Sequence, residues 1–182
     1  MRRSLVFAVP SVLALSLGLV GCATAPAGSP ASPATSAGLP DFELPTVDGD
    51  SFRLSDHLGK SVIVMAFLDT WCEPCKSELP HLSEIYRTHK DEGLLVVAIS
   101  MDDPTTAAQV APYVKRSGYT FPVLLDRSTQ AANLYNIHKS APYTVVIDRQ
   151  GNIASEKAGF EPGSEKNLES ELIKLLAKHP SS

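Results

Sequence analysis

Cysteine is scarce in this sequence, and neither sign of charge is in large excess. Three cysteines among 182 residues exclude a small exported domain that is held together by several disulfides. The formal net charge of −4 argues against nucleic acid or an anionic lipid surface as the main partner. The chain has no internal repeat, which excludes a solenoid or another repeat architecture.

The N-terminal apolar stretch is too short to be a lasting transmembrane helix. It covers residues 5–20 and contains Pro10, and a membrane-spanning helix needs about 20 apolar residues. Arg2 and Arg3 precede it, as basic residues precede the apolar part of an export signal. The Arg pair lacks the fuller pattern of a twin-Arg signal, so we expect ordinary Sec export.

The apolar stretch ends in a motif that resembles a bacterial lipobox, Leu19-Val20-Gly21-Cys22. The resemblance implies that residues 1–21 are a lipoprotein signal peptide and that Cys22 is lipidated and begins the mature chain. The alternatives are an ordinary signal peptide with a chance cysteine, or an uncleaved anchor. Lipidation would hold the protein on the periplasmic side of a bacterial membrane. Ala23 lacks the aspartate that retains some lipoproteins at the inner membrane, which favours the outer membrane.

The segment after the lipobox has the composition of a linker. Residues 22–40 contain the expected lipidated cysteine followed almost entirely by Ala, Pro, Ser, Thr and Gly, without charge or periodicity. Residues 41–182 are long enough for one domain. Removal of the signal peptide takes the formal charge of the chain from −4 to −6.

The domain alternates segments of strand and helix character. Continuous apolar runs of strand length suit central strands that are covered on both faces, and amphipathic segments suit the covering helices. This order predicts an α/β fold with a mixed central sheet and helices on both faces. The expected elements are a hairpin at 41–54, strands at 61–68, 94–99 and 121–125, helices at 74–90, 103–116 and 129–135, a hairpin of strands at 143–148 and 153–157, and a helix at 164–178.

The two remaining cysteines form one motif, Trp71-Cys72-Glu73-Pro74-Cys75, between an expected strand and an expected helix. A helix N-terminus has unpaired N–H groups and a partial positive charge, which favour a thiolate over a thiol. The thiolate is the species that attacks a disulfide. We therefore interpret the pair as a reversible disulfide that carries the function and not as a structural cross-link.

The segment 67–80, Phe-Leu-Asp-Thr-Trp-Cys-Glu-Pro-Cys-Lys-Ser-Glu-Leu-Pro, resembles the TlpA/ResA-like membrane-tethered thioredoxins. Their signature is roughly Trp-Cys-x-Pro-Cys-x-x-Glu-x-Pro, and every fixed position is present. Ala141-Pro142-Tyr143-Thr144 lies before a strand, where thioredoxin folds have a cis-proline loop. The resemblance covers about residues 40–178 and implies a thioredoxin-like fold with an N-terminal hairpin extension.

Within this motif each residue has an expected role. Cys72 precedes the helix and is the expected exposed nucleophile, and Cys75, inside the first turn, is the expected resolving thiol. Pro74 suits the first turn because its missing N–H would be unpaired there. Pro80 should kink the helix, unless the helix simply begins later. Glu73 adds negative charge beside Cys72, which should keep the Cys72 pKa from falling to very low values and favours a reductant.

The resemblance implies that Glu78 is an active-site carboxylate that modulates the cysteine pKa values and shuttles a proton. The alternative is a solvated helix glutamate. Thioredoxin itself carries a buried acid six residues before its first cysteine, and here that position is Ala66. In the absence of that buried acid, Glu78 or water must accept the proton that a cysteine thiol loses. Asp69 should lie at the end of its strand or point away, and is a weaker candidate for this role.

Four residues are expected to form the substrate-binding surface: Trp71, Pro74, Ala141 and Pro142. Pro142 is the expected cis-proline, with a trans proline ending a loop as the alternative. The resemblance implies that the backbone of Ala141 pairs with an extended substrate chain, a mode of recognition that tolerates many sequences. Trp71 should flank the active site, and the alternative is a core aromatic residue.

Together these features indicate a lipid-anchored thiol–disulfide oxidoreductase, expected to be a monomer, that reduces disulfides in exported proteins. The resemblance implies an integral-membrane thiol donor, which would favour the inner membrane, and apocytochrome c is one substrate that it suggests. We expect no cofactor beyond the Cys72–Cys75 pair and no bound metal. His81 could join the two cysteines around a metal, but one Cys-x-x-Cys is half of a usual zinc site.

Two alternative functions stay open. A peroxiredoxin-like peroxidase shares the scaffold, but its cysteine follows a Pro-x-x-x-Thr/Ser-x-x-Cys pattern whose proline is absent here. A non-catalytic metal or haem-delivery module would use the same thiols.

Overall fold

A computed structural model of the chain describes residues 38–178. The expected signal peptide, the expected lipidation at Cys22 and nearly all of the expected linker lie outside the described residues. Within the described range, no helix has the length and apolar character that a membrane crossing requires.

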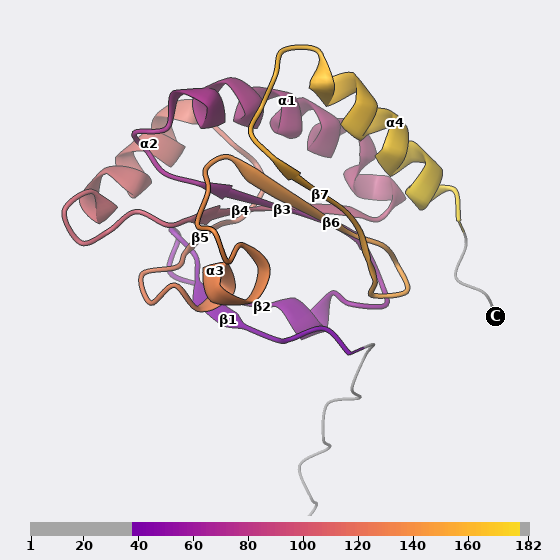
Figure 1. The fold of residues 1–182 in the computed structure, drawn as a ribbon, viewed down its shortest axis with the longest axis horizontal. Coiled ribbons are helices and arrows are strands. Elements are labelled where there is room, and N and C mark those ends of the chain that lie inside the picture. Colours follow the sequence, from indigo (N-terminus) through magenta and orange to yellow (C-terminus); the bar gives the residue numbers. More distant parts are fainter. Residues whose placement is uncertain (1–37, 179–182) are drawn as a thin grey trace, which may run out of the picture. The chain divides into compact units, whose positions relative to one another are not determined.

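The centre of the domain is a five-stranded mixed sheet (Figure 1). Its strands lie in the order β5-β4-β3-β6-β7, with β3, β4 and β5 parallel to one another and β6 and β7 antiparallel to their neighbours. All seven residues of β3 are buried, as a central strand covered on both faces requires. The strands are β3 Val62–Leu68, β4 Leu94–Ser100, β5 Val123–Leu125, β6 Tyr143–Ile147 and β7 Ile153–Ala158.

Helices cover both faces of this sheet, as the sequence predicts. The helices α1 Glu73–His89, α2 Val110–Ser117 and α4 Ser164–Leu176 lie on one face. The other face carries α3 Gln130–Tyr135 and the hairpin of β1 Glu43–Pro45 and β2 Ser51–Arg53 (Figure 1). Short 3-10 turns complete the elements at Leu54–Asp56, Lys90–Glu92 and Ala107–Gln109.

Alternation along β3 divides the core into two parts. Val62, Val64 and Ala66 face α1 and α4, whereas Ile63 and Met65 face α3 and the hairpin. Side chains of successive strand residues point to opposite faces of a sheet, so one buried strand supplies both cores. The core on the α1 side also contains the two cysteines of the motif.

The expected helix at 103–116 is shorter than predicted. The Asp103 carboxylate does accept hydrogen bonds from the backbone N–H groups of Thr105 and Thr106, but these bonds form a single turn and not the start of an α-helix. The α-helix begins at Val110, because Pro112 has no N–H and would clash with the carbonyl four residues earlier in a longer helix. Pro112 is tolerated in the first turn of α2, where an N–H would have no helical partner.

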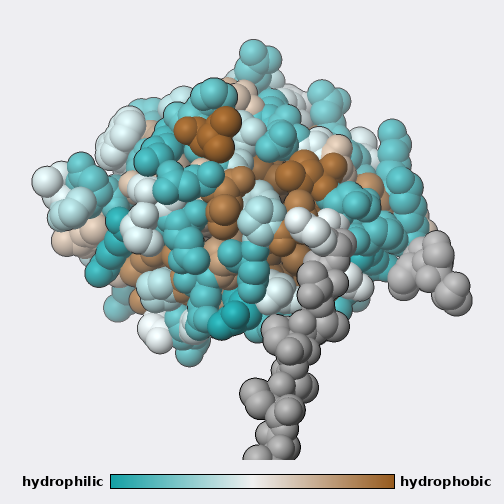
Figure 2. Space-filling model, turned by 60° about the horizontal axis from the view of Figure 1, so that its bottom comes forward, coloured by the Kyte–Doolittle hydropathy of each residue, from teal (hydrophilic) through white to brown (hydrophobic). Residues whose placement is uncertain are grey.

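The terminal helix α4 packs on the sheet through Leu172, Leu175 and Leu176, which are buried. Its neighbouring apolar residue Ile173 is 48% exposed. Apolar atoms reach the surface in small separate patches between polar side chains on the face seen in Figure 2. The most exposed large apolar side chains of residues 38–178 are Ile137 and Trp71.

Candidate active site

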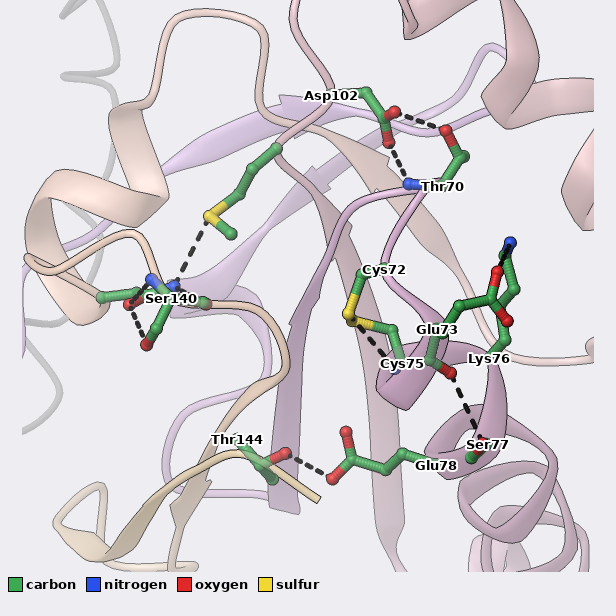
Figure 3. Close-up of a disulfide and its surroundings, with 12 residues drawn as sticks. Thr70, Cys72, Glu73, Cys75, Lys76, Ser77, Glu78, Asp102, Ser140 and Thr144 are labelled. Carbon is green, nitrogen blue, oxygen red and sulfur yellow. Dashed lines mark hydrogen bonds and ion pairs between the residues drawn. A yellow bond between two sulfur atoms is a disulfide. The ribbon is translucent and has the colours of Figure 1, made fainter. Parts of the chain in front are cut away.

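Cys72 and Cys75 form a disulfide at the point where β3 leads into α1 (Figure 3). Cys72 is the N-cap of α1, and Glu73 and Pro74 begin the helix. Pro74 suits the first turn because it has no N–H group that would need a hydrogen-bond partner there. The backbone N–H of Cys75 donates to Cys72 Sγ at 3.2 Å. The Cα atoms of the two cysteines are 5.3 Å apart, within the usual range for a disulfide.

The prediction that Cys72 is exposed is wrong for this disulfide form. The residue is only 4% exposed, because its sulfur is bonded to Cys75 above the first turn and both residues pack in the α1-side core. The neighbouring Trp71 is 65% exposed, so the alternative of a core aromatic is wrong as well. The indole of Trp71 is therefore accessible at the surface, one residue before Cys72.

The loop before β6 contains a cis peptide bond between Ala141 and Pro142, as expected for a cis-proline loop. Ala141 is half-buried and packs against the core cluster that contains both cysteines. Asn136, which sequence reasoning missed, holds this loop. Its buried amide donates to the Ser140 carbonyl at 2.8 Å and accepts from the Ser140 N–H at 3.1 Å. An asparagine after a helix and before a proline loop was the available signal.

Glu78 is buried on α1 and contacts β6, so the alternative of a solvated helix residue is wrong. The Thr144 hydroxyl donates to Glu78 Oε1 at 3.0 Å, and Figure 3 shows the Glu78 side chain extending toward Thr144. Burial raises the pKa of Glu78, while the Thr144 hydroxyl and the charge of Lys157 act in the opposite direction. Ala66 lies opposite Thr144 in the sheet and leaves no acid on β3.

Asp102 fixes the segment before the cysteines. Its carboxylate is 2% exposed and accepts from the Thr70 backbone N–H at 2.9 Å and from the Thr70 hydroxyl at 2.5 Å. The Ser100 hydroxyl donates to the same carboxylate at 2.9 Å. Sequence reasoning missed this contact because Thr70 and Asp102 are 32 residues apart.

Asp69 follows directly after β3, and its backbone carbonyl accepts from the Cys72 N–H at 3.0 Å. The residue is buried, and this burial, together with the negative charges of Asp102 and Asp103, raises the pKa of Asp69 to about 6. The Asp69 carboxyl is thus partly protonated near neutral pH.

We expect Asp69→Asn to stabilise the protein at pH 7 by about 1–2 kcal/mol. The folded protein binds the Asp69 proton more tightly than the unfolded chain does, so folding stability decreases as pH rises from about 4 to 6. The amide removes this cost. The gain in melting temperature should be present at pH 7 and absent below pH 4. An equal gain at both pH values would contradict the raised pKa.

Among residues 38–178, no three His, Cys, Asp or Glu side chains gather in a way that could hold a metal ion. His81 does not approach the cysteines as a ligand. It stacks on Phe160, with ring centroids 5.8 Å apart.

Comparison with known proteins places these features among thiol–disulfide oxidoreductases. The AhpC/TSA family model matches residues 36–156. The chain is 36% identical over 133 residues to the thiol-disulfide oxidoreductase ResA of Geobacillus kaustophilus, covering 72% of this chain and 74% of that protein. It is 30% identical over 136 residues to ResA of Bacillus cereus, covering 75% of each.

Solved structures show the same arrangement. A thiol:disulfide interchange protein of the thioredoxin family from Chlorobium tepidum aligns with a TM-score of 0.66 and 26% identity, covering 76% of this chain and 95% of that one. The exposed lipoprotein thioredoxin Etrx1 of Streptococcus pneumoniae aligns with a TM-score of 0.64 and 28% identity, covering 75% and 100%. The predicted thioredoxin-like fold with its N-terminal hairpin is confirmed.

Proposed function

This chain belongs to the AhpC/TSA family and is a thiol–disulfide oxidoreductase similar to ResA, and on that premise we propose that it reduces disulfides in exported proteins from a membrane anchor. The observation that carries the proposal is the Cys72–Cys75 disulfide at the N-terminus of α1. It combines a favoured thiolate position with a partner thiol one helical turn away.

In the proposed reaction, the reduced Cys72 thiolate attacks one sulfur of a substrate disulfide. A mixed disulfide forms and the other substrate sulfur leaves as a thiolate. Cys75 then loses its proton and attacks Cys72 Sγ, which releases the second substrate thiolate and leaves the Cys72–Cys75 disulfide. Two electrons pass to the substrate, and its two thiolates take up two protons. A membrane thiol donor restores the dithiol by the reverse exchange.

The substrate-binding surface is proposed to consist of Trp71, Pro74, Ala141 and Pro142. The exposed indole and the loop that packs on the cysteine core support this assignment. The negative charge of Glu73, which the sequence suggested would disfavour the Cys72 thiolate, is partly compensated, because Lys76 Nζ lies 2.6 Å from Glu73 Oε1. The direction of electron flow is therefore set by the reduction potential of the Cys72–Cys75 pair.

We also propose that the domain is tethered through lipidated Cys22 on the periplasmic side of a membrane, with apocytochrome c among its substrates. The lipobox at 19–22 and the exposed lipoprotein relative in Streptococcus pneumoniae support the tether. Ala23 favours the outer membrane, whereas an integral-membrane donor would favour the inner one. We propose that the monomer needs no cofactor beyond its own disulfide.

A redox titration tests this function. We would use residues 22–182 carrying Cys22→Ser and follow the fluorescence of Trp71, the sole tryptophan of the chain and the neighbour of Cys72. A two-electron midpoint near or below about −250 mV is expected for a reductase. A midpoint near about −120 mV would reverse the direction of electron flow. If no intramolecular disulfide formed at any potential, the assignment of Cys72 and Cys75 would be lost. Rapid peroxide consumption by the reduced protein would favour the peroxidase alternative.

A further inference from the structure

Three side chains lie side by side across the sheet beneath Glu78. Ala66 on β3 is opposite Thr144 on β6, and Thr144 is opposite Lys157 on β7. Because residues in register on neighbouring strands point to the same face, all three lie on the α1 side of the sheet. The small side chain of Ala66 is fully covered, and Thr144 is the residue of this row that binds the Glu78 carboxylate.

A cleft of about 320 Å³ connects this row to the surface. Glu78 and Thr144 line it and are buried, whereas Lys157 lines it and is exposed. Its other lining residues come from α1, β6, β7, the loop after β7 and α4, where Ser164 and Leu168 contribute. Glu78 is thus covered by its own helix and by the sheet, but the cleft gives water a path from the surface to the carboxylate.

Other ionisable groups line the cleft, and their contacts differ from those of Lys157. On α1, His81 stacks on Phe160. On β7, Glu156 accepts a hydrogen bond from the Tyr143 hydroxyl at 3.1 Å.

On α4, Glu165 accepts from the Gly163 N–H at 2.7 Å, and Glu171 also lines the wall. Among the groups around the cleft, Lys157 is the one whose positive charge lowers the pKa of Glu78. The Lys157 ammonium group on β7 and the Thr144 hydroxyl on β6 therefore both favour the ionised form of Glu78.

We propose that Thr144 and Lys157 are positioning residues of the dithiol reaction, which hold the Glu78 carboxylate in its ionised form at the inner end of this cleft. This inference rests on the proposed function of the cysteine pair. When the Cys75 thiol loses its proton, Glu78 accepts the proton and the Cys75 thiolate attacks Cys72 Sγ. Water in the cleft then takes the proton from Glu78, and no further oxidant or reductant is required.

The proposal predicts a shift in the pH dependence of turnover in Lys157→Met. Loss of the positive charge makes Glu78 harder to ionise, so the rising limb of the rate against pH should move upward by about 0.5–1 pH unit. Thr144→Val should shift the limb in the same direction, because the isosteric side chain donates no hydrogen bond. The rates are measured with a fluorescent disulfide peptide and the mature protein carrying Cys22→Ser.

Controls separate this effect from a change in overall charge or folding. Lys174→Met removes an equal charge from the exposed side of α4, outside the cleft, and should leave the limb in place. Lys157→Arg keeps the positive charge and should leave the rising limb where it is in the unaltered protein. In a Glu78→Gln background, Lys157→Met should produce no shift, because the group on which it acts is gone.

The inference is overturned if Lys157→Met leaves the limb unmoved, or if its shift persists with Glu78→Gln. Failure of the proposed function would look different, because the unaltered protein would then fail to reduce the peptide at any pH.

Discussion

Cys75→Ser is expected to reduce turnover by roughly 10³-fold or more and to leave the protein covalently joined to its substrate through Cys72. The serine hydroxyl cannot displace the mixed disulfide, so the reaction stops after its first exchange. We propose Cys72 as the nucleophile because of its position at the start of α1. It is the N-cap residue, and its sulfur accepts the N–H of residue 75. These features favour a thiolate at Cys72, whereas Cys75 lies within the first turn of α1.

The adduct is detected by mass spectrometry of the Cys22→Ser, Cys75→Ser protein after incubation with a disulfide peptide. The matched control is Cys72→Ser in the same Cys22→Ser background. It retains one thiol in the motif and should form no stable adduct, because Cys75 lacks the N-cap position and the N–H donor that favour a thiolate at Cys72. An adduct with Cys72→Ser and none with Cys75→Ser would exchange the two roles.

The second large effect is on stability. Asp102→Ala is expected to lower the free energy of unfolding by about 3 kcal/mol, and the melting temperature by roughly 10 °C. The variant leaves three donors buried without their acceptor: the Thr70 N–H, the Thr70 hydroxyl and the Ser100 hydroxyl. Because Thr70 lies two residues before Cys72, the loss should also increase backbone motion in the segment that carries the nucleophile.

Thermal unfolding measures the change, and Asp91→Ala is a suitable control. Asp91 is exposed and lies in the short turn after α1, so its replacement should change stability by less than about 0.5 kcal/mol. Equal effects of the two substitutions would mean that the Asp102 carboxylate is not a structural anchor. A large effect at Asp102 alone would assign the anchoring of the active-site segment to this one side chain.

Most of the fold could be predicted from the sequence, because the signals were local. The apolar run at 61–68 and the motif at 71–75 mark a buried strand and a helix start within a few residues. The N-terminal turn of a helix depends on the N-cap and the first few residues, so Cys72 and Pro74 predict the start of α1 directly. The predicted start of α2 at residue 103 was wrong although it also used a local signal. Asp103 is a residue type that caps helices well, but Pro112 decides that α2 begins at Val110.

The sequence by itself determined the Cys72–Cys75 motif and the helix that supports it, which depend on residues close together along the chain. The cis-proline loop was expected from the resemblance to a known family. Only the tertiary structure decided that Cys72 is covered, that Thr70 is held by Asp102, and that Glu78 meets Thr144. Thr144 follows Glu78 by 66 residues, and Lys157 comes beside them only because β6 pairs with both β3 and β7. Contacts of this kind depend on the order and register of strands, and a change of register by one residue would turn Thr144 or Lys157 to the opposite face of the sheet.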